Sequence, residues 1–233
     1  ISRFYDREPK NRSMEYQLME FDKKFIDGIL RKSKLSTTAF FSLCAVRALH
    51  FIQSERGEEK NPIVVYIPKS LRFELKNLRA YQNLLGFIWM KFSRERLKAP
   101  DFNNHFRDFY KFRSTPNEVR KVIWAAALIT KLTSYSKLRK MLYKKETKIH
   151  DSSILVSSGR TPKEIKFPEV FNTSKFYARG VMHRSPGIGL LITSNDEMDF
   201  VCVEYLKDAF DQKSISRFCE ILNNEIIHYK FDS

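Results

Sequence analysis

The amino-acid sequence predicts an α/β (α+β) layered sandwich, and three observations support that class. The chain has 233 residues, of which 42% are hydrophobic and 14% aromatic, so it can form a substantial core. In its first part, short apolar runs rich in β-branched residues alternate with longer segments of helical period. In its last part, a polar turn joins two apolar runs as a hairpin, and an amphipathic segment closes the chain.

The first 52 residues predict an entry segment and two helices. Residues 1–12 are polar and charged and are expected to be extended. Over residues 14–33 the apolar side chains recur at steps of three and four, which predicts a helix. Ser36-Thr37-Thr38 then offers an N-cap for a second helix over 39–52, which is apolar almost all round and is therefore expected to be buried.

The rest of the chain predicts two strands, two helices, four strands and a closing helix. These elements are expected at 63–67, 83–92, 101–112, 116–143, 154–159, 176–182, 189–193, 200–205 and 211–227. Pro68 is expected to end the first of these strands, and Gly159 to form a turn at the end of the third. Thr115 followed by Pro116 is typical of a helix start. Trp89 and Trp124 lie in apolar segments and are expected in the core.

The composition excludes several classes of protein. With only 7 glycines, the chain has no G-x-G-x-x-G and no Walker-type phosphate loop. Cys44, Cys202 and Cys219 form no C-x-x-C and no metal spacing, which favours reduced, buried thiols and a cytoplasmic protein. No apolar run reaches the roughly 18 residues of a membrane span. The start Ile-Ser-Arg-Phe is neither an initiator Met nor a signal peptide, so a piece of a longer protein is expected.

Positive charge is concentrated in the first two thirds of the chain. Residues 151–233 hold 10 basic and 12 acidic residues, whereas residues 1–150 hold 32 and 15, a net charge of +17. An anionic partner would suit this part: nucleic acid, an acidic carrier protein, a phosphorylated cofactor or anionic lipid. A lysine-rich solvated surface explains the same charge without any partner.

Several short motifs follow this order of elements. They are Pro68-Lys69-Ser70-Leu71-Arg72 after the first strand, Leu85-Gly86-Phe87, Ser157-Ser158-Gly159, and the hairpin with its closing helix over 189–218. The succession resembles the C-terminal half of the chloramphenicol acetyltransferase-like superfamily. That group includes nonribosomal-peptide condensation domains, alcohol acetyltransferases, wax-ester synthases and plant acyltransferases. The Asn of the family's Leu-Gly-Asn segment is missing here.

The resemblance implies a fold, an activity and partners. Residues 1–233 would be a C-terminal subdomain with a mixed sheet flanked by helices, which is half of a two-subdomain acyltransferase-like fold. The whole enzyme would move an acyl group from a thioester to a hydroxyl or amine, with acyl-coenzyme A or a phosphopantetheinyl carrier, possibly an acidic carrier protein, as donor. An upstream N-terminal half of the same fold would be the main partner.

The catalytic signature of that superfamily, His-His-x-x-x-Asp, is absent from this chain. Its second His is the general base that accepts a proton from the acceptor. The five histidines stand at 50, 105, 150, 183 and 228, and none has the doubled His or the right spacing to an Asp. The sequence therefore assigns no catalytic residue and no metal to this chain, and the resemblance implies that the base lies in the missing half. His183, beside Arg184 in an expected turn, is more typical of a surface residue.

The resemblance also suggests a wall of the substrate channel and part of the donor site. The residues assigned to it are Arg72, Ser157, Ser158, Gly159, Tyr177 and Arg179. Arg72 would face cofactor phosphates, or else form a structural ion pair. The two serines would donate hydrogen bonds to a pantetheine arm, or else form an ordinary turn. Tyr177 and Arg179 alternate along an expected strand, so both point to one face, which is either the channel wall or the outside.

Two other functions fit the sequence. One is a non-catalytic interaction or scaffold domain that keeps the fold without the chemistry. The other is a basic nucleic-acid-binding module, in which the aromatic residues of Tyr110-Lys111-Phe112-Arg113 would stack on bases, although an amphipathic helix shows the same spacing. The coding sequence before Ile1 would distinguish the enzyme from the scaffold, because only the enzyme needs a His-His-x-x-x-Asp there.

Overall fold

The computed structural model describes residues 13–57, 62–70, 85–137, 140, 152–160 and 187–231. In chain order, the elements are β1 (Met14–Asp22), α1 (Lys23–Ser33), α2 (Thr37–Glu55), β2 (Ile63–Ser70), β3 (Leu85–Phe92), α3 (Arg94–Leu97), α4 (Phe102–Arg113), α5 (Pro116–Leu132), β4 (Ser152–Arg160), β5 (Ile188–Ser194), β6 (Met198–Leu206) and α7 (Gln212–Ile227).

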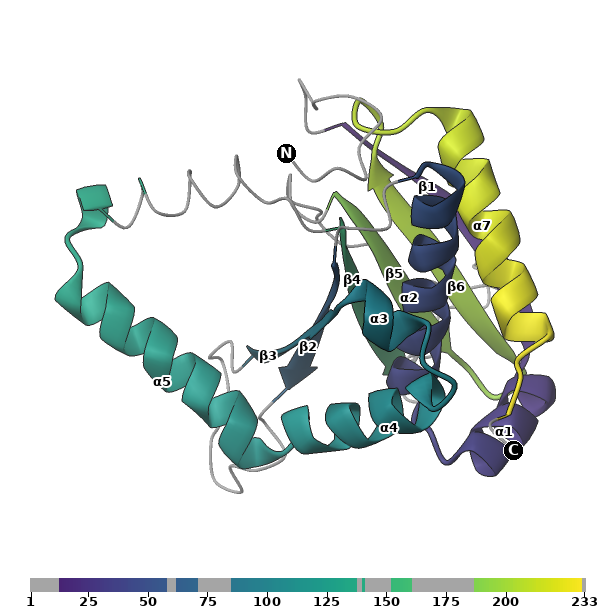
Figure 1. Cartoon of the computed structure of the whole chain (residues 1–233), viewed down its shortest axis with the longest axis horizontal. Coiled ribbons are helices and arrows are strands. Elements are labelled where there is room, and N and C mark those ends of the chain that lie inside the picture. The colour runs from purple at the N-terminus through teal and green to yellow at the C-terminus, as the bar shows by residue number, and fades with distance from the viewer. Residues whose placement is uncertain are drawn as a thin grey trace, which may run out of the picture.

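Six strands form one mixed sheet in the order β1-β6-β5-β4-β2-β3. β4 runs parallel to both β2 and β5, whereas the other neighbours are antiparallel. α2 and α7 lie side by side against one face of the sheet (Figure 1). The layered sandwich predicted from the sequence is confirmed, including the β5–β6 hairpin and the closing helix.

The buried helix α2 forms the centre of the core. Phe40, Phe41 and Leu43 are fully buried, as an all-round apolar helix requires. The N-cap prediction is also correct, because the Ser36 side chain accepts a hydrogen bond from the Ala39 N–H at 3.3 Å. At the other end of the sheet, β3 buries Phe92 between side chains of α4.

The helix predicted over residues 14–33 is wrong in its first half. Met14–Asp22 is an edge strand that pairs antiparallel with β6 along its whole length. Leu18 and Phe21 fit a helical step, but apolar and polar side chains in this segment also alternate as in a strand. The nine-residue ladder with β6 favours the strand over the helix. The helix begins only at Lys23, where Asp22 Oδ1 accepts the Phe25 N–H at 2.8 Å.

Two predicted strand ends are also wrong. β2 continues through Pro68 to Ser70, because beyond Tyr66 it pairs with β3 alone among the described strands, and a proline is tolerated where one side of a strand is unpaired. β4 continues through Gly159, which pairs with Thr193 of β5 and does not form a turn. In both cases a neighbouring strand extends the element past its expected breaker.

The long helix predicted over 116–143 ends at Leu132, where Thr133 adopts an extended conformation. Thr115 and Pro116 begin it as expected, but the Thr115 hydroxyl donates to the Phe112 carbonyl at 2.9 Å and does not cap the helix. The expectation that both tryptophans are core is wrong: Trp89 is 43% exposed and Trp124 is 75% exposed.

Some expectations lie outside the described residues, namely the entry segment 1–12 and the strand 176–182.

Among the described helices, none is by itself long and apolar enough to cross a membrane; α1 and α2 meet that criterion only as a pair bent by 88°.

Candidate functional site

The sheet divides into two wings at the C-terminal ends of β2 and β4. The parallel ladder between these strands covers only four pairs and stops at Tyr66 and Leu155. Beyond that point β2 continues with β3 to Ser70, and β4 continues with β5 to Arg160. We call this divergence the fork. Among the described residues, no ladder joins β4 to β2 beyond this point, so the fork is a place where a ligand chain can approach the edges of two strands.

Ser157, Ser158 and Gly159 form the β4 side of the fork. Side chains alternate along a strand, so Ser157 and Ser158 point to opposite faces of the sheet. Ser158 is exposed, Ser157 is half-buried, and the space around Gly159 is open, with nothing within 4 Å of the position a Cβ would take. These three predicted residues are therefore neighbours at the fork, although they do not share one surface.

The Ser158 hydroxyl forms a hydrogen bond with Thr38 Oγ1, in the first turn of α2. Ser36 caps the same turn, which contains no acidic residue. Two hydroxyls that share one hydrogen bond leave the second O–H hydrogen directed elsewhere. The helix dipole adds partial positive charge at this end. Together these groups can donate hydrogen bonds to the carbonyl or amide oxygens of an extended ligand.

The β2 side of the fork has a structural role at Lys69. Its ammonium donates to the Ser114 carbonyl, at the C-terminal end of α4. A cation there offsets the negative end of the helix dipole. Of the Pro68–Arg72 motif only residues 68–70 are described; Arg72 lies outside the described residues, as do Tyr177, Arg179 and His183.

A buried carboxylate that the sequence did not predict lies at the same end of the sheet, toward the edge formed by β1. Asp199 is fully buried in β6 and accepts a hydrogen bond from the Ser194 hydroxyl. Lys23 lies 3.4 Å from Asp199 Oδ2 and 2.7 Å from Asp27 Oδ1. This arrangement joins the β5–β6 hairpin to the start of α1. No pattern in the sequence links Asp199 to Lys23, since they meet only through the β1–β6 pairing.

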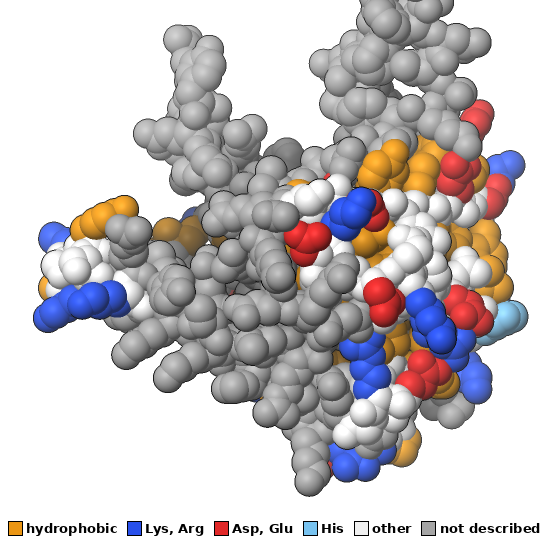
Figure 2. Space-filling model, turned by 90° about the horizontal axis from the view of Figure 1, so that it is seen from above, with side chains coloured by type: hydrophobic (Ala, Val, Ile, Leu, Met, Phe, Trp, Pro, Cys, Tyr) orange, Lys and Arg blue, Asp and Glu red, His pale blue; other side chains and the backbone are white. Residues whose placement is uncertain are grey.

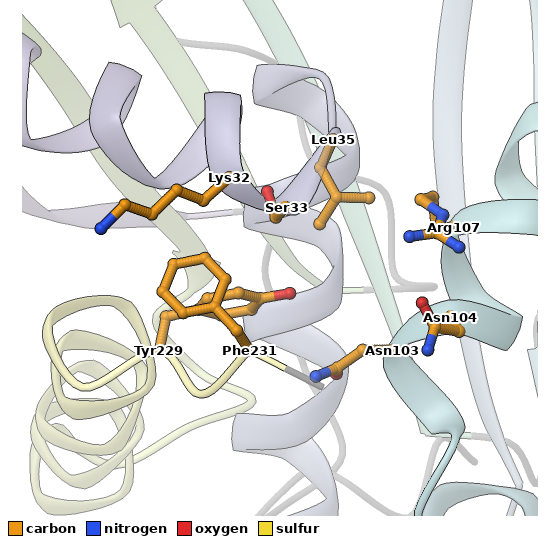
Figure 3. Close-up of a pocket in the computed structure, with 8 residues that line it drawn as sticks. All are labelled: Lys32, Ser33, Leu35, Asn103, Asn104, Arg107, Tyr229 and Phe231. Carbon is orange, nitrogen blue, oxygen red and sulfur yellow. The ribbon is translucent and has the colours of Figure 1, made fainter. Parts of the chain in front are cut away.

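A small pocket of about 70 Å³, partly open to solvent, lies between the end of α1, the start of α4 and the tail after α7 (Figure 3). Lys32 and Arg107 line it on opposite sides, and the Lys32 ammonium points away from Arg107. Asn103 is already engaged, because its amide accepts from Arg47 at 2.6 Å and donates to the Lys230 carbonyl at 3.1 Å. The sequence did not predict this pocket. Its lining side chains connect neighbouring elements of the fold, and none of them is a reactive group.

The described titratable groups are structural. His105 stacks on Phe109 with ring centroids 5.8 Å apart, and burial together with the nearby Arg96 guanidinium lowers the pKa of its imidazole. All three cysteines are buried and free, as predicted. Burial raises the pKa of the Cys219 thiol to about 12, so this thiol is a poor nucleophile near neutral pH.

Comparisons with known proteins bear on the fold. No protein-family model and no curated protein sequence matches the chain. Among solved structures, the epimerization domain from the third module of tyrocidine synthetase B has a TM-score of 0.58 and 8% identity, over 95% of this chain and 48% of that one. The wax ester synthase/diacylglycerol acyltransferase from Marinobacter aquaeolei VT8 has a TM-score of 0.55 and 9% identity, over 92% and 48%.

A condensation domain that mediates chain release from the enacyloxin polyketide synthase is similar as well. Its TM-score is 0.51 at 12% identity, over 94% of this chain and 41% of that one. The chain thus spans about half the length of these structures, or less. The fold is that of condensation-domain and acyltransferase proteins, and the half-fold predicted from the sequence is confirmed.

Proposed function

We propose that this chain is the C-terminal subdomain, residues 1–233, of an acyltransferase that moves an acyl group from a thioester to a hydroxyl or amine. The observation that carries the proposal is the shared fold over more than nine tenths of the chain with an epimerization domain, a condensation domain and a wax ester synthase. The fold alone does not define a reaction, so the assignment depends on what the fork can bind.

In this proposal the fork is one wall of the substrate channel. Ser158 and the first turn of α2 hydrogen-bond the amide groups of the donor's arm, and the open space at Gly159 leaves room for its backbone. Arg72, Tyr177 and Arg179, which lie outside the described residues, are assigned to the same donor site, with Arg72 as the residue for cofactor phosphate. The donor is acyl-coenzyme A or a phosphopantetheinyl carrier protein, and the net charge of +17 on residues 1–150 attracts either.

The complementary half supplies the general base. That base removes a proton from the acceptor hydroxyl or amine as its oxygen or nitrogen attacks the thioester carbonyl. The tetrahedral intermediate then collapses, the carbon–sulfur bond breaks, and the departing thiolate is protonated. None of the described histidines of this chain is placed at the fork, so the chain is assigned no base there. Its contribution in this proposal is to orient the donor.

A non-catalytic scaffold of the same fold is the second candidate. It is favoured by the histidine environment, since His105 is packed against aromatic rings and no His-His-x-x-x-Asp exists in the chain. A scaffold would keep the sheet and the fork but bind no thioester.

Binding titrations separate these candidates. The whole product of the gene is titrated with acyl-coenzyme A and with an acidic carrier protein at low and physiological salt, alongside duplex DNA. The proposal expects saturable donor binding that weakens as salt rises and that weakens further in a Ser158→Ala variant. Ser33→Ala, which removes a hydroxyl bonded within α1, is the matched control. Absence of donor binding would favour the scaffold, and tight length-dependent DNA binding would favour a nucleic-acid module.

A further inference from the structure

Helix α5 extends away from the sheet, beyond β3 (Figure 1). Among the described residues, its first turns pack on β3: Val119 is buried against Gly86, and Ile123 Cδ1 lies 3.4 Å from the position that a Cβ on Gly86 would take. Glu118, held between Arg113 at 3.1 Å and Lys121 at 2.6 Å, fixes the same end. The helix is therefore held at its N-terminal end, and its described side chains from Trp124 to Leu132 are exposed.

The projecting part of α5 is apolar on several sides. Trp124, Leu128 and Leu132 form one stripe at i, i+4 and i+8, with exposed fractions of 75%, 57% and 75%. Ile123 and Ile129, on either side of that stripe, are 37% and 45% exposed. A helix that is apolar in this way is normally surrounded by an apolar medium, whether a protein core or a membrane.

Every charge along this segment is positive. Residues 122–130 carry none, and the one hydroxyl among them, on Thr130, donates to the Ala127 carbonyl at 2.8 Å within the helix. From residue 120 to residue 140 the sequence has six basic and no acidic side chains. Figure 2 shows hydrophobic and basic side chains next to each other at this end of the molecule.

These observations distinguish between possible occupants. A second copy of the chain would bring two sets of cations together, which Coulomb repulsion opposes. An anionic lipid surface covers the exposed stripe of α5, while the flanking cations meet the lipid phosphates.

We propose that the projecting part of α5 binds the interface of a membrane rich in anionic phospholipid. Trp124, Leu128 and Leu132 insert at the level of the headgroups and upper acyl chains, and Lys131 contacts lipid phosphates. The helix lies in the interface and does not span it. A membrane-bound enzyme half of this kind would meet acyl groups at a lipid surface.

The fluorescence of Trp124 tests the proposal directly. The chain has 2 tryptophans, so Trp89→Phe leaves Trp124 as the only reporter. This variant is mixed with vesicles of phosphatidylcholine alone, or of phosphatidylcholine with phosphatidylserine. The expected result is a blue shift and quenching by brominated acyl chains in the anionic vesicles only. Adding Leu128→Glu should weaken vesicle binding about tenfold or more.

A matched control separates insertion from the effect of added negative charge. Phe51 is 50% exposed on α2, so Phe51→Glu changes charge equally and should leave binding unchanged. Circular dichroism verifies that each variant is folded. Three results would overturn the proposal: vesicle binding without a blue shift or quenching, no binding at all, or a blue shift that grows with protein concentration in the absence of lipid, which would indicate a second copy.

Discussion

Gly86 and Val119 are in such close contact that no side chain fits between them: a Cβ on Gly86 would lie 2.2 Å from Val119 Cγ1. This contact seats α5 on β3. It also gives a physical reason for a glycine at this position of β3.

Gly86→Ala is therefore expected to destabilise the protein. Overpacking a close contact costs about 1–3 kcal/mol of unfolding free energy, because Val119 or the backbone must move. Chemical denaturation measures the change. Gly28→Ala is the control, since nothing lies within 4 Å of its Cβ position and alanine is favoured in the helix interior, so that variant should be as stable as the wild type or more so.

Truncation of Phe41 or Leu43 in α2 should cost about 2–5 kcal/mol, the range for emptying a fully buried large side chain. Denaturant unfolding of each alanine variant gives this value. Phe51→Ala, on the exposed side of the same helix, should change stability much less. Equal effects at the buried and exposed positions would show that α2 is not the centre of the core.

Lys23 balances the buried Asp199 carboxylate. Lys23→Met leaves that carboxylate with the Ser194 hydroxyl as its described partner, which should lower the unfolding free energy by at least about 1–3 kcal/mol. The neighbouring Lys24 is exposed, so Lys24→Met is the control and should have little effect. If the two variants were equally stable, Asp199 would have to be neutralised by another group.

Alkaline pH should destabilise the protein partly through Tyr205. Burial, together with its hydrogen bond to Glu15, raises the pKa of Tyr205 to about 12, above the usual value near 10. The unfolded chain therefore loses this proton first, so the contribution is present below about pH 10 and is lost as the pH rises toward 12. Tyr205→Phe should be less stable at neutral pH and lose stability less steeply in that window, whereas an identical slope would contradict the assignment.

How far the sequence predicted the structure depends on whether each feature is local. The burial of α2 follows from its own composition, and the caps at Ser36 and Asp211 follow from residue type at a helix start. The strand β1 was missed because it is defined by pairing with β6. Trp124 was expected in the core because an apolar helix gives no sign of whether its partner is present.

The candidate site was predicted only in part. The motif Ser157-Ser158-Gly159 led to the right strand, but the contact between Ser158 and Thr38 joins residues 120 positions apart. The fork itself depends on where the β2–β4 ladder stops, which no single segment encodes. Nothing described here tests the roles assigned to Arg72, Tyr177 and Arg179, which stay predictions.

The central claim is tested most directly by acyl transfer from a thioester. Release of free thiol and formation of the acylated acceptor are measured for the 233-residue chain alone and for the whole product of its gene. The account predicts turnover by the whole product only, because this chain has no His-His-x-x-x-Asp, and a general base is worth roughly 10²- to 10⁴-fold in rate. Turnover by the 233-residue chain alone would contradict it, and so would a whole product that contains a His-His-x-x-x-Asp and transfers no acyl group from any thioester.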